Sequence, residues 1–140
     1  RIHILDAVPQ DQLLAWSASA DVGLIPYVAD CLNTYYCTPN KLFEFIAAGL
    51  PILASDLPEL RRFVTGTAIG LNADLATPAS MAAAITSIFA DAPRLQHFRE
   101  MLLTVRQEIK WEREGARFAA LYEPLRLQTS PSRNLAASTR

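Results

Sequence analysis

The chain has 140 residues, of which 51% are hydrophobic and 19% are charged, and its formal net charge is −1. This length corresponds to one domain that can bury a core, and the lack of a basic excess disfavours nucleic acid as a partner. No apolar run reaches the roughly 20 residues that a transmembrane helix needs, and no secretory leader is visible, so we expect a cytoplasmic protein.

The first half of the chain alternates between strand-like and helix-like segments. Its predicted segments are, in chain order, a strand, a helix, a buried strand, a long irregular segment and a second helix: residues 1–5, 9–20, 22–25, 27–39 and 40–48. The second strand is a continuous apolar run, typical of a parallel strand covered on both faces. Gly49 follows the second helix at the position where a left-handed residue ends a helix. Because the first strand begins at residue 1, we expect that part of the domain precedes it.

The second half continues the alternation and ends in helices. It predicts a buried strand, a helix, a short strand and three more helices, at residues 51–54, 58–64, 68–71 and then from Thr77, Pro93 and Trp111. Asp56 is expected to cap the helix at 58–64, with Glu59 completing the capping box. This alternation predicts an α/β fold, with about four parallel strands and helices on both faces of the sheet. Residues 1–127 form the predicted domain, and the polar, aperiodic residues 128–140 a disordered tail.

The cysteines and histidines indicate little chemistry. Cys31 and Cys37 stand six residues apart, which matches neither a redox pair nor half of a spaced zinc site. A reduced pair is the favoured interpretation, and a disulfide within the loop is the alternative. His3 and His97 are far apart in the sequence, so we expect no metal site.

The long irregular segment is the first candidate for function. In an open parallel sheet, ligands bind beyond the carboxyl ends of the strands, and long loops in compact domains are usually functional. Residues 27–39 leave one such strand end and lead into the helix at 40–48. We therefore expect ligand contacts to gather on three segments at these ends: Asp6–Pro9, Tyr36–Glu44 and Ser55–Glu59.

The helix at 40–48 is the second candidate. It is apolar almost all round, which is typical of a buried helix, and its polar residues Asn40, Lys41 and Glu44 lie near its start. Lys41 and Glu44 are three residues apart and share a face, so one interpretation is a partly exposed ion pair. The other is an anion site formed by the free N–H groups of the helix and Lys41, with Glu44 accepting a hydrogen bond from a ligand hydroxyl.

The block TPNKLFEFIAAGLPILA at residues 38–54 resembles the "PxKxxEyxAxGxPVVa" signature of family 4-like glycosyltransferases, the glycosyl transferases group 1. Residues 20–27, ADVGLIPY, are similar to the family's "aDvgllPy" strand, and Trp111 matches its closing helix, so the resemblance covers residues 1 to about 127. These enzymes have the GT-B architecture of two Rossmann-like domains. The resemblance implies that this chain is the C-terminal, donor-binding domain, without its first β-α unit and without the N-terminal acceptor domain.

The resemblance also implies roles for individual residues. Glu44 falls on the second glutamate of the family's E-x7-E motif, which typically accepts hydrogen bonds from the ribose of the donor nucleotide. The first glutamate falls on Tyr36, at a position that usually faces the transferred sugar, so the identity of that sugar does not carry over. Asp6 stands where relatives often have glycine, close to the expected position of the base. The predicted donor-binding residues are Tyr36, Thr38, Asn40, Lys41 and Glu44, with Thr38, Asn40 and Lys41 near the diphosphate.

The function implied is sugar transfer from a nucleotide-diphosphate donor to a glycan, lipid or other acceptor, in polysaccharide biosynthesis. No catalytic residue is assigned, no cofactor is expected because the nucleotide sugar is a substrate, and the intact enzyme could touch a membrane peripherally. We expect the chain alone to be inactive, because the cleft of a GT-B enzyme needs both walls to orient its substrates.

Two alternatives remain open: a GT-B-shaped nucleotide-sugar epimerase, and a non-catalytic Rossmann-like interaction module. A dinucleotide-binding domain is disfavoured, since no Gly-x-Gly-x-x-Gly follows any predicted strand.

Overall fold

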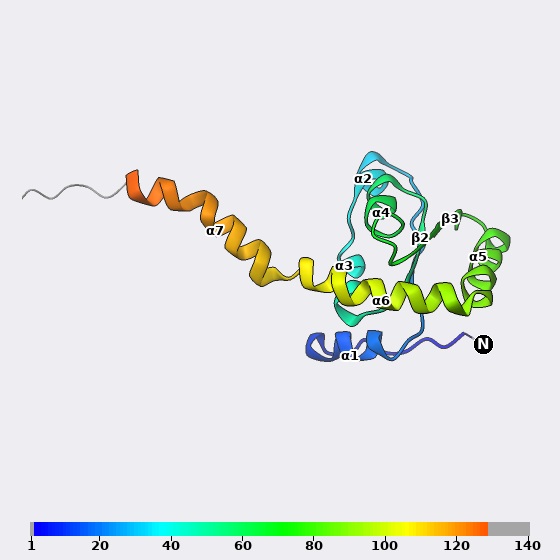
Figure 1. The fold of residues 1–140 in the computed structure, drawn as a ribbon. Helices are drawn as coiled ribbons and strands as arrows, with labels where there is room; N and C mark the ends of the chain where they lie inside the picture. Colours follow the sequence, from blue (N-terminus) through cyan, green and yellow to red (C-terminus); the bar gives the residue numbers. More distant parts are fainter. Residues whose placement is uncertain (1, 129–140) are drawn as a thin grey trace, which may run out of the picture. The chain divides into compact units, whose positions relative to one another are not determined.

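Three parallel strands form the centre of the structure, a computed structural model that describes residues 2–128. The strands lie side by side in the order in which they occur in the chain, with Leu24 opposite Leu53 in the register of the first pair. They are β1 (Gly23–Ile25), β2 (Ile52–Ser55) and β3 (Gly70–Ala73), and Figure 1 labels the last two. With helices around this sheet, the predicted α/β, Rossmann-like fold is confirmed.

The helices follow the predicted alternation, with one addition. The predicted helix at 9–20 is a short 3₁₀ helix that continues into an α-helix, and a further short helix, α2, forms within the segment predicted to be irregular. The helical elements are η1 (Gln10–Gln12), α1 (Leu13–Ala18), α2 (Leu32–Tyr36), α3 (Asn40–Ala48), α4 (Pro58–Phe63), α5 (Pro78–Ala90), α6 (Ala92–Glu108) and α7 (Trp111–Gln128). The chain divides after Glu108 into two compact units, and α7 belongs to the second.

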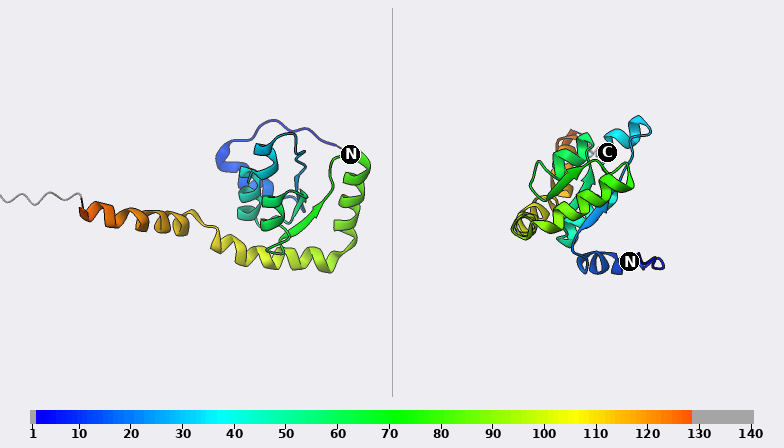
Figure 2. Two further views of the ribbon diagram at one scale, coloured as in Figure 1. Left: turned by 90° about the horizontal axis from the view of Figure 1, so that it is seen from above. Right: turned by 90° about the vertical axis from the view of Figure 1, so that its right-hand side faces the viewer.

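Helices cover both faces of the sheet in the first unit. Side chains alternate between the faces of a strand, so Leu53 points to one face and its neighbour Ala54 to the other. Leu53 belongs to a buried cluster with residues of α5 and α6, two helices that follow one another at a sharp angle (Figure 2). On the opposite face, α3 packs against β1, and the ring of Phe45 lies directly against the Cα of Gly23.

The strand predicted for residues 1–5 is not formed. Residues 2–9 are irregular, and the side chains of Ile2 and Ile4 are 94% and 95% exposed. A strand is held by hydrogen bonds to a neighbouring strand, and β1 pairs only with β2 among the described residues. The described sheet therefore has three strands, and the prediction of a fourth was wrong because an apolar pattern does not supply a hydrogen-bonding partner.

Two further predictions are corrected near the chain reversals. The irregular segment at 27–39 contains α2, which starts where the thiol of Cys31 accepts a hydrogen bond from the backbone N–H of Thr34. The third strand begins at Gly70 and not at residue 68, because Ala68 has a positive φ of 55° and belongs to the turn that precedes the strand.

The second unit contains α7, which confirms the helix predicted from Trp111. Within this helix, the rings of Phe118 and Tyr122 are in contact with centroids 4.9 Å apart, and Arg117 pairs with Glu114 at 2.6 Å. No helix within residues 2–128 is both long enough and apolar enough to cross a membrane. Of the predicted tail at residues 128–140, Gln128 is the last residue of α7 and the others lie outside the described residues. The predicted domain boundary at residue 127 stays a prediction.

Candidate functional site

The candidate site lies where the chain leaves β1 and enters α3. Helix α3 starts after Pro39 and ends at Gly49, whose φ of 73° is the left-handed conformation expected for the residue that terminates a helix. Its apolar residues Leu42 and Ile46 are 0% and 2% exposed, so the helix is fixed in the core. The polar start of α3 is thereby held at the carboxyl edge of the sheet.

The structure places the five predicted donor-binding residues between the end of α2 and the middle of α3. Tyr36 is the exposed last residue of α2, and Thr38 is half-buried in the connection between the two helices. Asn40 is exposed at the first position of α3, while Lys41 and Glu44 are half-buried on it. Within α3, Asn40 and Glu44 are four residues apart, which corresponds to about 6 Å along the helix axis.

Lys41 and Glu44 do not form the ion pair that was one interpretation of the sequence. The ammonium group of Lys41 lies 5.6 Å from the centroid of the Tyr27 ring, at the end of β1, as a cation–π contact. Within the part of the chain that the structure describes, the Glu44 carboxylate has neither an ion-pair nor a hydrogen-bond partner. The half-buried Glu44 carboxylate is thus left available to an external hydrogen-bond donor.

An open cavity of about 560 Å³ adjoins this region. The sequence singles out the loop that forms part of its wall, but not the individual residues that line it. Its walls come from the end of β1, from α2 and from the start of α3: Pro26, Tyr27, Val28, Asp30, Asn33, Thr34, Cys37 and Pro39. Of the three segments expected to gather ligand contacts, only Tyr36–Glu44 borders it. The signal for the polar residues Asp30, Asn33 and Thr34 was present in the length and polarity of the loop, but their convergence depends on α2.

Hydrogen bonds organise the wall formed by α2. The side chains of Thr34 and then Cys31 hydrogen-bond to Asp30 and lower the pKa of its carboxyl below the usual 3.8, so this carboxylate is charged at neutral pH. The Cys37 thiol donates to the Thr34 carbonyl oxygen at 3.4 Å, at the other end of the helix. Both thiols are free, as the favoured interpretation predicted.

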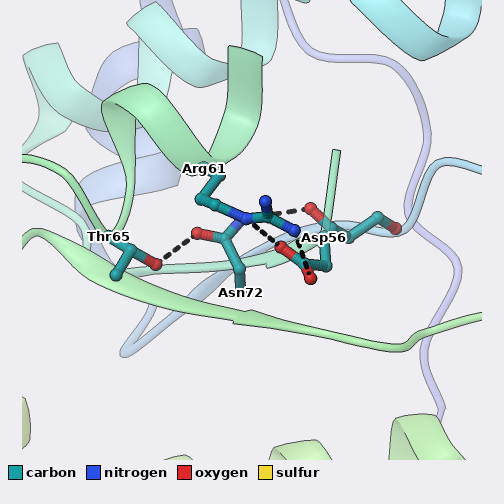
Figure 3. A network of polar contacts seen from close by, with 5 residues as sticks. Asp56, Arg61, Thr65 and Asn72 are labelled. Atoms are coloured by element: carbon teal, nitrogen blue, oxygen red, sulfur yellow. Dashed lines mark hydrogen bonds and ion pairs between the residues drawn. The ribbon is translucent and has the colours of Figure 1, made fainter. Parts of the chain in front are cut away.

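A polar network holds the carboxyl ends of β2 and β3, next to α4 (Figure 3). Arg61 donates from Nε to Asp56 Oδ1 at 2.7 Å and lies 2.6 Å from Oδ2 through Nη2, and this hydrogen bonding lowers the pKa of Asp56. Asn72 donates to the Ser55 carbonyl oxygen at 3.0 Å and accepts from the Thr65 hydroxyl. The network ties the loop after β2 to α4 and to β3.

This network corrects the predicted capping box. Leu57 occupies the position before α4, and no side chain caps that helix. Asp56 is engaged by Arg61, and Glu59 by Arg62 at 2.7 Å, because the two arginines in the last turn of α4 are within reach of these carboxylates. The carboxylates of the predicted segment Ser55–Glu59 therefore support the fold of the loop.

The described residues contain no group of three His, Cys, Asp or Glu side chains that could hold a metal ion. The site itself combines the N-terminus of α3 and the Lys41 ammonium group with the carboxylates of Asp30 and Glu44.

Comparison with known proteins supplies the family. Residues 1–91 match the glycosyl transferases group 1 family, a stretch that includes all three strands, the cavity residues and α3. No curated protein and no solved structure matches the chain. Because the match covers well over half of the 140 residues and coincides with the described sheet and site, the chain belongs to the glycosyl transferases group 1 family and carries a GT-B glycosyltransferase-like domain.

Proposed function

We propose that this domain binds the nucleotide-diphosphate sugar of a glycosyltransferase at the start of α3, for transfer of the sugar to a glycan, lipid or other acceptor. The observation that carries the proposal is the state of Glu44. Its carboxylate is half-buried on a helix fixed in the core, yet it has no partner among the described residues. A carboxylate in this situation is suited to accept hydrogen bonds from ligand hydroxyls, which for this family's donors means the ribose.

The start of α3 suits the diphosphate of such a donor. The first backbone N–H groups of a helix have no partner within the helix and carry partial positive charge, which favours a bound anion. Asn40 and Lys41 lie in this first turn, and Thr38 lies just before it. Lys41 rests on the Tyr27 ring and not on a carboxylate, so it can turn to a phosphate without breaking an ion pair.

The remaining parts of the proposal extend the predictions from the sequence. The donor is a substrate, so no cofactor is invoked, and Tyr36 would lie toward the transferred sugar. Acceptor binding and catalysis would involve a second GT-B domain, in polysaccharide biosynthesis in the cytoplasm. Sugar transfer by residues 1–140 alone would contradict the proposal that acceptor binding and catalysis need a second domain.

The test is a titration of the 140-residue chain with UDP, GDP and ADP, using the parent and Glu44→Ala. A hydrogen bond to a charged group is worth about 1.5–3 kcal/mol, so we expect the affinity for the preferred diphosphate to fall roughly tenfold to a hundredfold. Glu100→Ala, which removes an exposed carboxylate from α6, is the matched control and should leave the affinity unchanged. A folded Glu44→Ala protein with the parent's affinity would overturn the proposal.

A further inference from the structure

Two cysteines stand at the two ends of α2, and both are free thiols. Cys31 directly precedes the helix and is exposed, while Cys37 directly follows it and is half-buried. The proposed donor site uses neither of them. Two thiols of one short segment can be joined by oxidation, so their placement around a single helix couples the redox state of the pair to the structure of that helix.

Both thiols support α2 through Thr34, in the middle of the helix. The Cys31 sulfur accepts a hydrogen bond from the Thr34 backbone N–H at 3.5 Å and lies 3.3 Å from the Thr34 hydroxyl oxygen. The Cys37 thiol donates a hydrogen bond to the Thr34 carbonyl oxygen at 3.4 Å. The reduced pair therefore stabilises α2 from both of its ends.

The two cysteines are too far apart to be joined while α2 is helical. They are six residues apart across the helix, which corresponds to about 9 Å along the helix axis. A disulfide needs a Cα–Cα distance of about 4.4–6.8 Å, so the backbone between the cysteines must rearrange before their sulfurs can bond. The disulfide and the helical form of α2 therefore exclude one another.

Helix α2 can unwind at low cost. It has five residues, and none of them is buried. So short a helix is marginal by itself, and segments with few buried contacts open locally with little free energy. The ends of a loop of about ten residues meet within about 10–100 ns, so the two sulfurs would come together often once α2 opens.

We propose that Cys31 and Cys37 form a thiol–disulfide switch, in which oxidation joins the two sulfurs and unwinds α2. The oxidant is a small-molecule disulfide such as oxidised glutathione. The thiolate of the exposed Cys31 attacks one sulfur of this disulfide and releases one reduced thiol. The Cys37 thiolate then attacks the Cys31 sulfur in the mixed disulfide and releases the second. The protein loses two hydrogen atoms, and the oxidant is reduced to two thiols.

The switch acts on the cavity beside α3. Asn33 and Thr34 line this cavity from α2, and Cys37 lines it from the end of that helix. Unwinding displaces all three side chains, so oxidation removes the part of the wall that α2 provides. Helix α3 stays in place, because Leu42 and Ile46 fix it in the core. The inference is independent of the proposed function, since it involves no bound donor.

The first experiment follows the thiols of the 140-residue chain. The chain is incubated at about pH 8 with mixtures of reduced and oxidised glutathione, the remaining thiols are alkylated, and the intact mass is measured. We expect the number of free thiols to fall from two to none, with no glutathione retained, and dithiothreitol to restore both thiols. Cys37→Ser should stop with one glutathione bound to Cys31, because no second thiol displaces it.

The second experiment follows the two helices by NMR. On oxidation, the backbone resonances of residues 32–36 should lose their helical chemical shifts, and those of residues 42–46 in α3 should keep theirs. The double variant Cys31→Ser with Cys37→Ser is the control, and the same treatment should leave its spectrum unchanged.

Four outcomes would overturn the switch. They are an unchanged number of free thiols at every glutathione mixture, formation of mixed disulfides or linked dimers alone, an oxidised chain that stays helical at residues 32–36, and loss of the helical shifts of α3 together with those of α2. None of these measurements includes a nucleotide, so a failure of the switch leaves the proposed donor site standing.

Discussion

Two neighbouring helices border the candidate site, and they are held in place very differently. Helix α3 buries Leu42 and Ile46 completely or nearly so, whereas α2 has no buried residue and its Leu32 is 77% exposed. Helices with few buried apolar contacts open locally at low free-energy cost. Asn40, Lys41 and Glu44, which we propose for the diphosphate and ribose, thus lie on the fixed helix, whereas the cavity residues Asn33 and Thr34 lie on the loosely held one.

The largest effect should come from removing the anchor of α3. Leu42→Ala deletes a fully buried side chain and leaves a cavity, which typically costs about 2–5 kcal/mol of unfolding free energy. Urea unfolding followed by circular dichroism measures this change. A loss below about 1 kcal/mol would show that α3 is not the fixed wall of the site.

A smaller loss is expected from the contact between α3 and β1. In Gly23→Ala the new Cβ would overlap the Phe45 ring, so the ring and α3 must move away from the strand. Overpacking of this kind typically costs about 1–3 kcal/mol. A double-mutant cycle with Phe45→Leu checks the cause, because the smaller side chain should restore part of the loss, and strictly additive effects would contradict the contact.

Helix α2 packs beside α4, which carries Arg61 (Figure 1). The ion pair between Arg61 and Asp56 therefore allows the stability of this neighbouring helix to be tested by pH. Arg61 lowers the pKa of Asp56 below 3.8, so the stabilisation is fully present above that pH and is lost as the pH falls through the lowered pKa. Both side chains are about half-exposed, so the effect should be modest.

The measurement for this pair is the difference in unfolding free energy between the parent and Asp56→Asn at pH 7, 5 and 3. We expect the unfolding free energy of the parent to exceed that of Asp56→Asn by the same amount at pH 7 and pH 5, and by a smaller amount at pH 3. An advantage that grows on acidification would contradict the assigned direction.

The smallest effect should come from the exposed apolar residue of α2. Leu32→Ala makes the same chemical change as Leu42→Ala at a site that is 77% exposed, so the unfolding free energy should change by no more than about 0.5 kcal/mol. The pair of leucine substitutions measures the contrast between the helices directly. Equal losses of unfolding free energy at Leu32 and Leu42 would show that the two helices are held equally firmly.

The candidate site could be predicted from the sequence as far as α3 but not as far as α2. Asn40, Lys41 and Glu44 stand out as polar residues at the start of an apolar helix that ends at Gly49, and these are local signals. Asp30 and Asn33 stand in the long polar loop that the sequence singles out, but no local pattern marks these two residues within it, because α2 is short, has no buried residue and begins at a cysteine cap. Only the folded chain shows that these two residues face one cavity.

The sequence by itself determined β1 and β2, because short continuous apolar runs are typical of strands covered on both faces. It also determined α3, because a helix that is apolar almost all round and is followed by glycine is typical of a buried helix with a defined end. Tertiary structure alone decided that residues 2–5 stay irregular, because a strand needs a hydrogen-bonding neighbour that no local pattern can supply. It also decided that Asp56 pairs with Arg61 and does not cap α4. Both outcomes depend on which groups come within hydrogen-bonding reach once the chain is packed, and that is a property of the whole fold.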